Sequence, residues 1–298
     1  MLEWKSANPT KIIVVCIHGL GLCARAYKPL AQELSAAGID GFGVNVRGFG
    51  PDRDQQDRAK LDCVDTVDDV SKMLVSLHKE HPDYKVFLVG ESMGGALAIR
   101  IAAENPKLVD GLVVSAPAWK LLKMRRTAVK GIFEIFLFSG SRPGPAERSV
   151  IHQATTDPKL IEHWLTDHSH KMKLSLGEAT AFFSFVKKTD KYAKQVENPV
   201  LVIQGLNDQL VSPKAVAKLF KDIPSSNKTF LIDGKGEHLV LEENRFSKAL
   251  TDKLIDWMQT DAVQSAPSTI EVINDQALSP AEKQHLDKLQ RLARSRPL

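Results

Sequence analysis

Residues 86–96 read VFLVGESMGGA, and an apolar run leads directly into the motif Gly90-Glu91-Ser92-Met93-Gly94. The run predicts a strand buried on both faces, as in a parallel sheet. The G-x-S-x-G pattern is typical of a sharp turn from strand to helix that holds its central serine in a strained conformation. Glycine at the flanking positions removes side chains that would collide with the packing there. We therefore predict an exposed nucleophile, Ser92, at the carboxyl end of a sheet, in preference to an ordinary glycine-rich turn.

Around this turn, short apolar runs alternate with stretches of helical spacing. Strands are predicted at residues 12–17, 39–46, 86–89, 112–115, 199–204 and 229–232, and helices at 25–37, 64–80, 92–105, 213–221 and 245–260. This alternation predicts an α/β fold, a mostly parallel sheet with helices on both faces. It lapses at residues 119–196, which we interpret as an inserted helical cap between two core segments, 1–118 and 197–260. Residues 261–298 are interpreted as a linker and a helix that starts at Ser279, with Glu282 completing a capping box.

A nucleophilic serine needs a base and an acid that orients the base. The strand at 199–204 runs into a loop with Asp208, and the strand at 229–232 runs into a loop with His238. Ser92, Asp208 and His238 thus have the chain order and the strand-end placement that a serine–histidine–aspartate triad needs. Asp233 and Glu237 are rival acids, but each is too close to His238 in sequence to come from a separate loop.

A tetrahedral oxyanion needs converging N–H donors. The sequence HGLG, residues 18–21, directly follows the first predicted strand. We expect the backbone N–H groups of Leu20 and Met93 to supply the donors, and His18 to brace the loop.

Composition narrows the class of protein. The 298 residues are 43% hydrophobic and 26% charged, with a formal net charge of +4, which is too weak to favour nucleic acid as a partner. Three cysteines without a spacing pattern argue against a disulfide framework and for a reducing compartment. The N-terminal residues MLEWKSANPTK lack the apolar region of a signal peptide, so a cytoplasmic protein is expected.

The cap sequence bears on the substrate. Residues 131–138 read GIFEIFLF and follow a basic segment. We interpret this as an apolar lid over an acyl pocket, with a basic collar able to touch anionic lipid, or as a cap helix that simply packs on the core. The histidine-rich stretch EHWLTDHSH, residues 162–170, lacks the His-x-x-x-His spacing of helical zinc sites, so no metal is expected.

Six landmarks in order carry a family resemblance: HGLG, RGFG, GESMGGALA, VSAPA, GLNDQLVSP and GEHLVLEE. Over residues 10–260 the chain resembles α/β-hydrolases of the monoacylglycerol lipase and lysophospholipase type. The resemblance implies Ser92 as nucleophile, His238 as general base, Asp208 as its orienter, Leu20 and Met93 as oxyanion donors, and no metal or organic cofactor. Little chain precedes residue 12, so the first strands common in this fold are expected to be nearly absent.

Two motifs depart from that family. Glu91 stands where the family often has histidine, and Asn45-Val-Arg47-Gly-Phe49-Gly50 stands where it often has Asp-x-Arg-Gly-His-Gly. Both departures weaken the inference from the substrates of that family to the substrate of this protein. The candidate substrate-binding residues are Gly19, Glu91, Phe133 and Phe136.

The expected function is hydrolysis of a carboxylic ester, a monoacylglycerol or similar lipid-like ester, through an acyl-enzyme. The expected partner is a small acyl ester, with peripheral membrane contact through the cap left open. An acyltransferase or thioesterase using the same triad is one alternative, and a non-catalytic ligand-binding protein on the same scaffold is another.

Overall fold

The computed structural model describes residues 1–120, 145–166, 174–262 and 268–294. These residues form an eight-stranded sheet in the order β1-β3-β2-β4-β5-β6-β7-β8, in which only β1 is antiparallel to its neighbour. The strands are β1 (Leu2–Trp4), β2 (Ile12–Ile17), β3 (Ile39–Val44), β4 (Lys85–Glu91), β5 (Gly111–Ser115), β6 (Val200–Gly205), β7 (Lys228–Asp233) and β8 (Thr269–Ile273). All six predicted strands are confirmed, and the α/β class with them.

The two edge strands of the sheet were not among the predicted strands. Before residue 12 the chain forms β1, a three-residue edge strand in which Trp4 Nε1 donates to the carbonyl of Ile39 (3.1 Å). Interpreting residues 261–276 as a linker was wrong in part, because β8 lies there and pairs in parallel with β7. All five residues of β8 are only half-buried, so it lacks the wholly apolar run that marks the inner strands.

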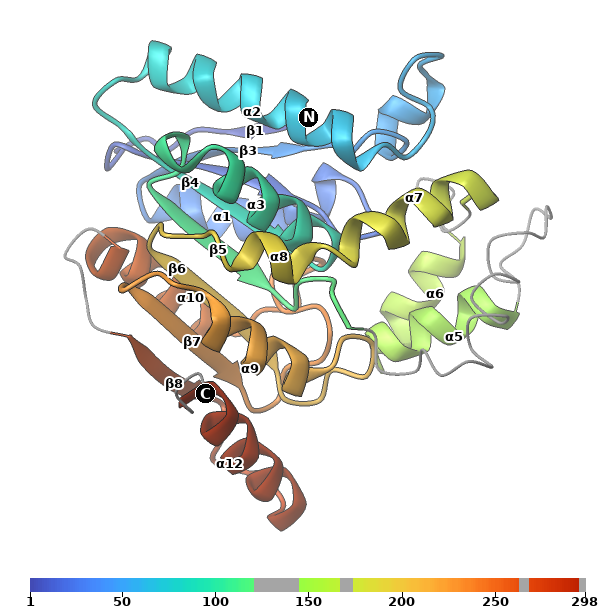
Figure 1. The fold of residues 1–298 in the computed structure, drawn as a ribbon, viewed down its shortest axis with the longest axis vertical. Helices are drawn as coiled ribbons and strands as arrows, with labels where there is room; N and C mark the ends of the chain where they lie inside the picture. The colour runs from blue at the N-terminus through green and yellow to red at the C-terminus, as the bar shows by residue number, and fades with distance from the viewer. Residues whose placement is uncertain (121–144, 167–173, 263–267, 295–298) are drawn as a thin grey trace.

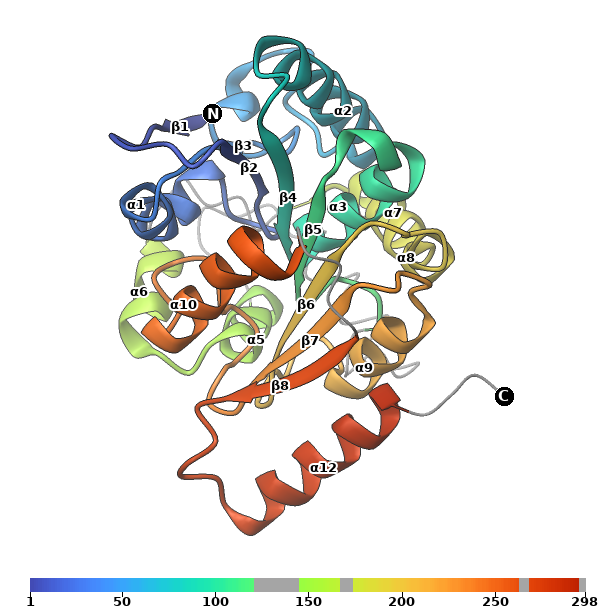
Figure 2. The same ribbon diagram turned by 90° about the vertical axis from the view of Figure 1, so that its left-hand side faces the viewer.

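Helices cover both faces of the sheet (Figures 1 and 2). In Figure 2, α1 and α10 lie on one side of the strands, and α2, α3, α8 and α9 lie on the other. The helices are α1 (Lys28–Ala36), α2 (Cys63–Glu80), α3 (Met93–Glu104), α5 (Pro145–Ala154), α6 (Pro158–Thr166), α7 (Leu176–Val186), α8 (Thr189–Ala193), α9 (Pro213–Asp222), α10 (Lys248–Asp256) and α12 (Pro280–Arg294). Short helical turns occur at η1 (Ala24–Tyr27), η2 (Gly50–Asp54), η3 (Pro106–Leu108) and η4 (Trp257–Asp261).

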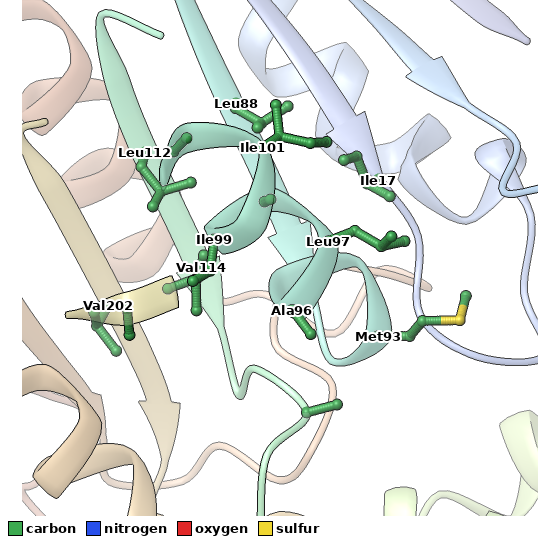
Figure 3. Packing of buried hydrophobic residues seen from close by; sticks show 14 of the residues in the cluster. Ile17, Leu88, Met93, Ala96, Leu97, Ile99, Ile101, Leu112, Val114 and Val202 are labelled. Carbon is green, nitrogen blue, oxygen red and sulfur yellow. The ribbon is translucent and has the colours of Figure 1, made fainter. Parts of the chain in front are cut away.

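Strand β4 shows why the inner strands are apolar throughout. Val86 and Leu88 belong to the buried cluster on the α3 side, whereas Phe87 and Val89 belong to the cluster on the α1 side. Figure 3 shows α3 lying against the strands, with Leu97 and other apolar side chains between them. Because both faces of β4 are buried, its last residues, which lead into Ser92, are held firmly from both sides.

Between β5 and β6, the described residues form only helices, α5 to α8. Side chains of α5 and α6, among them Ile151 and Trp164, share a buried cluster with Leu22 and Leu239 of the core. These helices therefore rest on loops at the carboxyl end of the sheet. The boundaries of the cap, residues 119–196, stay a prediction.

The C-terminal helix forms where the sequence predicted it. Ser279 N–H donates to Glu282 Oε2 (2.7 Å), and Glu282 N–H donates to Ser279 Oγ (3.3 Å), which is a capping box. Leu286 and Leu289 are buried, and α12 packs against α9. Helix α12 is thus an integral part of the described fold.

Candidate active site

Ser92 lies in a strained turn between β4 and α3. Its backbone has φ +54° and ψ −113°, a conformation that costs a non-glycine residue free energy and is held only by its surroundings. A Cβ on Gly90 would lie 2.2 Å from the carbonyl oxygen of Gly94, and one on Gly94 would lie 1.9 Å from that of Ile17. The predicted reason for glycine at both positions is confirmed, because backbone atoms occupy the space that a side chain would need.

Three side chains from separate loops meet at this turn. His238 Nε2 lies 2.9 Å from Ser92 Oγ, and His238 Nδ1 lies 2.9 Å from Asp208 Oδ2. The three residues are 8%, 2% and 4% exposed in the order serine, histidine, aspartate, so all three are buried, and Ser92 is less exposed than the sequence predicted. The structure therefore brings Ser92, His238 and Asp208 together in series.

Asp208 is held on both carboxylate oxygens. Oδ1 accepts the N–H groups of Leu210 (2.8 Å) and Val211 (2.9 Å), and Oδ2 accepts Gln204 Nε2 (3.0 Å) besides His238. Four donors fix the orientation of this buried carboxylate. Sequence analysis missed Gln204, although a polar residue at the end of an apolar strand is a signal that could have found it.

The rival acids are engaged elsewhere. Asp233 Oδ1 accepts the N–H groups of Lys235 and Gly236 at 3.0 and 3.1 Å. Glu237 accepts from Thr155 Oγ1 (3.0 Å) and the N–H of Thr156 (3.0 Å), at the start of the segment that leads into α6. Neither carboxylate is hydrogen-bonded to His238, and Glu237 instead ties the cap to the histidine loop.

Burial opposes the charged form of His238 and by itself would lower its pKa. The Asp208 carboxylate, through its charge and its hydrogen bond, and the more distant charge of Glu91 outweigh burial, so that the pKa of His238 is raised above its ordinary value. An imidazole in this setting is a stronger base than free histidine and favours the imidazolium that forms when it takes a proton.

The loop after β2 lies beside the serine. A Cβ on Gly19 would be 3.6 Å from Ser92 Cβ, so Leu20, the next residue, lies close to the turn. His18 braces this loop as predicted, because its buried Nε2 accepts the N–H of Val46 (3.0 Å). Met93 begins α3, where first-turn N–H groups have no partner within the helix.

Two of the four candidate substrate-binding residues have other roles. Glu91 is wholly buried and its carboxyl accepts bonds from Ser115 and from the backbone of residues 240–242, so the prediction that it binds substrate was wrong. The Gly19 N–H is likewise occupied by Glu242, a residue that sequence analysis did not single out. Phe133 and Phe136 lie outside the described residues.

Within the part of the chain that the structure describes, three or more His, Cys, Asp or Glu side chains are nowhere grouped so that they could hold a metal ion. Within the same residues, no helix has both the length and the apolar character that crossing a membrane requires.

The fold is that of an α/β-hydrolase. It is defined by the order of the strands in the sheet, by the turn at Ser92, and by the contacts that run from Ser92 through His238 to Asp208. A monoacylglycerol lipase structure from Paleococcus ferrophilus superposes with a TM-score of 0.69 at 22% identity, covering 88% of this chain and 100% of that one. The family model described as serine aminopeptidase, S33, matches residues 8–245. The chain belongs to this S33 family.

Curated relatives cover most of the chain at low identity. The human monoglyceride lipase is 26% identical over 243 residues, which span 80% of this chain and 79% of that protein. The monoacylglycerol lipase of Mycolicibacterium smegmatis is 25% identical over 258 residues, 86% of this chain and 90% of that protein.

Proposed function

We propose that this protein hydrolyses carboxylic esters through an acyl-enzyme on Ser92. The observation that carries the proposal is the unbroken series of contacts from Ser92 Oγ through the imidazole of His238 to the carboxylate of Asp208, each 2.9 Å long. Relatives named as monoacylglycerol and monoglyceride lipases support an ester rather than a peptide as the substrate.

The proposed reaction has two half-cycles. His238 Nε2 takes the proton of Ser92 as Oγ attacks the ester carbonyl, and Asp208 holds the Nδ1–H tautomer and stabilises the imidazolium. The N–H groups of Leu20 and Met93 donate to the oxyanion of the tetrahedral intermediate. His238 returns its proton to the departing alcohol. A water molecule, deprotonated by the same imidazole, then attacks the acyl-enzyme. The bond from the acyl carbon to Ser92 Oγ breaks, His238 gives the proton to Oγ, and the carboxylic acid is released.

A lipid-like monoacyl ester is the proposed substrate class. The names of the relatives favour it, and so does the apolar cap sequence at residues 131–138, in which Phe133 and Phe136 are the proposed acyl-chain contacts. Peripheral contact of this basic and apolar segment with a lipid surface belongs to the same proposal.

A fluorophosphonate probe, followed by a panel of esters, tests the proposal. We expect the probe to label wild-type protein at Ser92 and to leave Ser92→Ala unlabelled. Among p-nitrophenyl esters of graded length, monoacylglycerols and lysophospholipids, we expect turnover of medium or long monoacyl esters. Absence of labelling in folded protein would refute the proposal, and transfer of the acyl group to an added alcohol or thiol in preference to water would replace it with an acyltransferase. A preference for acetate esters over esters of every longer chain would refute the proposal of a lipid-like substrate, while the proposal of ester hydrolysis would stand.

A further inference from the structure

Two buried carboxyl groups lie behind the proposed catalytic residues and take no part in the reaction described above. Glu91 precedes Ser92, and Glu242 lies four residues after His238; both are 0% exposed. Burying two acidic groups close together is costly unless their hydrogen-bonding capacity is used.

Glu91 holds the loop that carries His238. Its oxygen atoms accept the N–H groups of Val240 (2.9 Å), Leu241 (3.2 Å) and Glu242 (2.9 Å), which begin two residues after the histidine. The hydroxyl of Ser115 donates to Glu91 Oε1 (2.6 Å), and the backbone carbonyl oxygen of Ser115 accepts the N–H of Ser92 (2.9 Å). One carboxyl group thereby joins the serine turn to the histidine loop.

Glu242 holds the loop that follows β2. Its two oxygens both accept the N–H of Gly19, at 3.0 and 3.1 Å, across a separation of 223 residues. The space next to the Gly19 Cα is bounded by Glu242 Oε2 on one side and by Ser92 Cβ on the other. The carboxyl group therefore sets the position of the residue just before Leu20, a proposed oxyanion donor.

We propose that Glu91 and Glu242 are positioning residues for catalysis, which together lock the serine turn, the histidine loop and the oxyanion loop in their reactive arrangement. This inference rests on the proposed function. In addition to holding the loops, Glu91 acts on the base electrostatically, since its negative charge favours protonated His238.

The groups that face the two carboxyls come from several elements. Glu91 interacts electrostatically with His238 and with Tyr27 of η1. Glu242 interacts with Tyr27, with Cys16 of β2, and with Cys23 and Glu243. None of these is a lysine or an arginine. Backbone N–H groups are therefore the main compensation for the two acids, which is the arrangement expected of a device that fixes loops.

The test separates loop position from charge. In Glu242→Ala, Gly19 loses its acceptor, and we expect kcat for a p-nitrophenyl ester to fall about tenfold to a hundredfold, less than the loss of a whole oxyanion donor, with KM within about threefold. Glu242→Gln keeps one carbonyl oxygen for Gly19 and should restore most of kcat. In Glu91→Gln, the ascending limb of kcat/KM against pH should move to lower pH, because a charge that favours protonated His238 has been removed.

Asp110→Asn is the matched control. Asp110 also accepts a backbone N–H, that of Val86 (2.9 Å), but at the start of β4, the end of the sheet remote from Ser92. We expect its kcat and pH profile to equal those of the wild type.

Two measurements by NMR do not depend on turnover. Hydrogen exchange at the Gly19 amide should accelerate in Glu242→Ala but not in Glu242→Gln, and the titration midpoint of the His238 ring should fall in Glu91→Gln. If the wild type hydrolyses no ester while both signals change as stated, the proposed function fails and the positioning role stands. If the wild type is active and the variants match it in kcat, Gly19 exchange and His238 midpoint, the positioning role is overturned.

Discussion

Replacing Asp208 by asparagine changes only one atom, yet the structure predicts a large loss of activity. Both oxygens of Asp208 face two donors each: Leu210 and Val211 N–H on Oδ1, and Gln204 Nε2 and His238 Nδ1 on Oδ2. Asparagine has a single carbonyl oxygen. If this oxygen keeps the two backbone bonds, the amide NH₂ faces His238, and the imidazole must turn to the tautomer with a bare Nδ1.

That tautomer carries its proton on Nε2, so it donates towards Ser92 Oγ and cannot take the serine proton. We expect kcat to fall about 10⁴-fold, the loss that the same change causes in a serine protease triad. At about 1.4 kcal/mol for each factor of ten, this is about 5.5 kcal/mol of transition-state stabilisation. Steady-state hydrolysis of a p-nitrophenyl ester measures it, and the thermal midpoint reports whether the variant is folded.

Asp233→Asn is the matched control, because Asp233 ends the next strand and is 4% exposed, as Asp208 is. Its three donors, from Lys235, Gly236 and Asn274, all share Oδ1, so an amide nitrogen can take the place of Oδ2 without losing a bond. We expect its kcat to stay within about threefold of the wild type. Folded Asp208→Asn that keeps more than about a tenth of the wild-type kcat would refute the assignment of Asp208 as the orienting acid.

Three further predictions concern the turn, the base and the buried acids. Gly94→Ala puts a Cβ 1.9 Å from the carbonyl oxygen of Ile17, so it should abolish activity and cost about 2–3 kcal/mol in chemical denaturation, whereas Gly177→Ala, with nothing within 4 Å of the new Cβ, should leave activity unchanged. Activity requires neutral His238, whose pKa is raised, so kcat/KM should increase with pH through a midpoint above that of free histidine. Burial and the charge of Glu91 hold the pKa of Glu242 well above its ordinary range, so the folded protein binds the proton of Glu242 more tightly than the unfolded chain does. The stability that this protonated carboxyl group contributes at about pH 4 is therefore lost as pH rises. Glu242→Gln should accordingly melt at a higher temperature than the wild type at about pH 9 and lose that advantage at low pH.

Each of these has an outcome that contradicts it. Active and stable Gly94→Ala would mean that the turn is looser than the backbone shows. A midpoint of kcat/KM against pH below that of free histidine would mean that burial outweighs the Asp208 carboxylate in setting the pKa of His238. A Glu242→Gln variant with the same dependence of melting temperature on pH as the wild type would mean that Glu242 titrates normally.

Those parts of the fold that sequence predicts well are the ones where a local pattern has one physical meaning. Wholly apolar runs mark the inner parallel strands, and the glycines around Ser92 mark a turn without room for side chains. Asp208 and His238 were found because each follows such a run. The strands β1 and β8 were missed because an edge strand is short and half-buried, so its sequence resembles that of a loop.

The errors at the site have a different origin. Glu91 was among the candidate substrate-binding residues, but in β4 alternate side chains point to opposite faces, and residue 91 follows Phe87 and Val89 towards the α1 side. That alternation could have corrected the assignment. No local pattern could have identified the partner of Glu242, because Gly19 lies 223 residues away and only the complete fold brings them together.

The pairing of β7 with β8 has a practical consequence for protein production. The family match ends at residue 245, yet the N–H of Gly234 donates to the carbonyl of Ile273 (2.9 Å), and Asn274 Nδ2 donates to Asp233 Oδ1 (2.9 Å). A protein truncated at residue 245 would lack β8, so β7, the strand that leads to His238, would become an exposed edge strand prone to aggregation. Expression plasmids should therefore retain the segment through α12, even though the family match ends at residue 245.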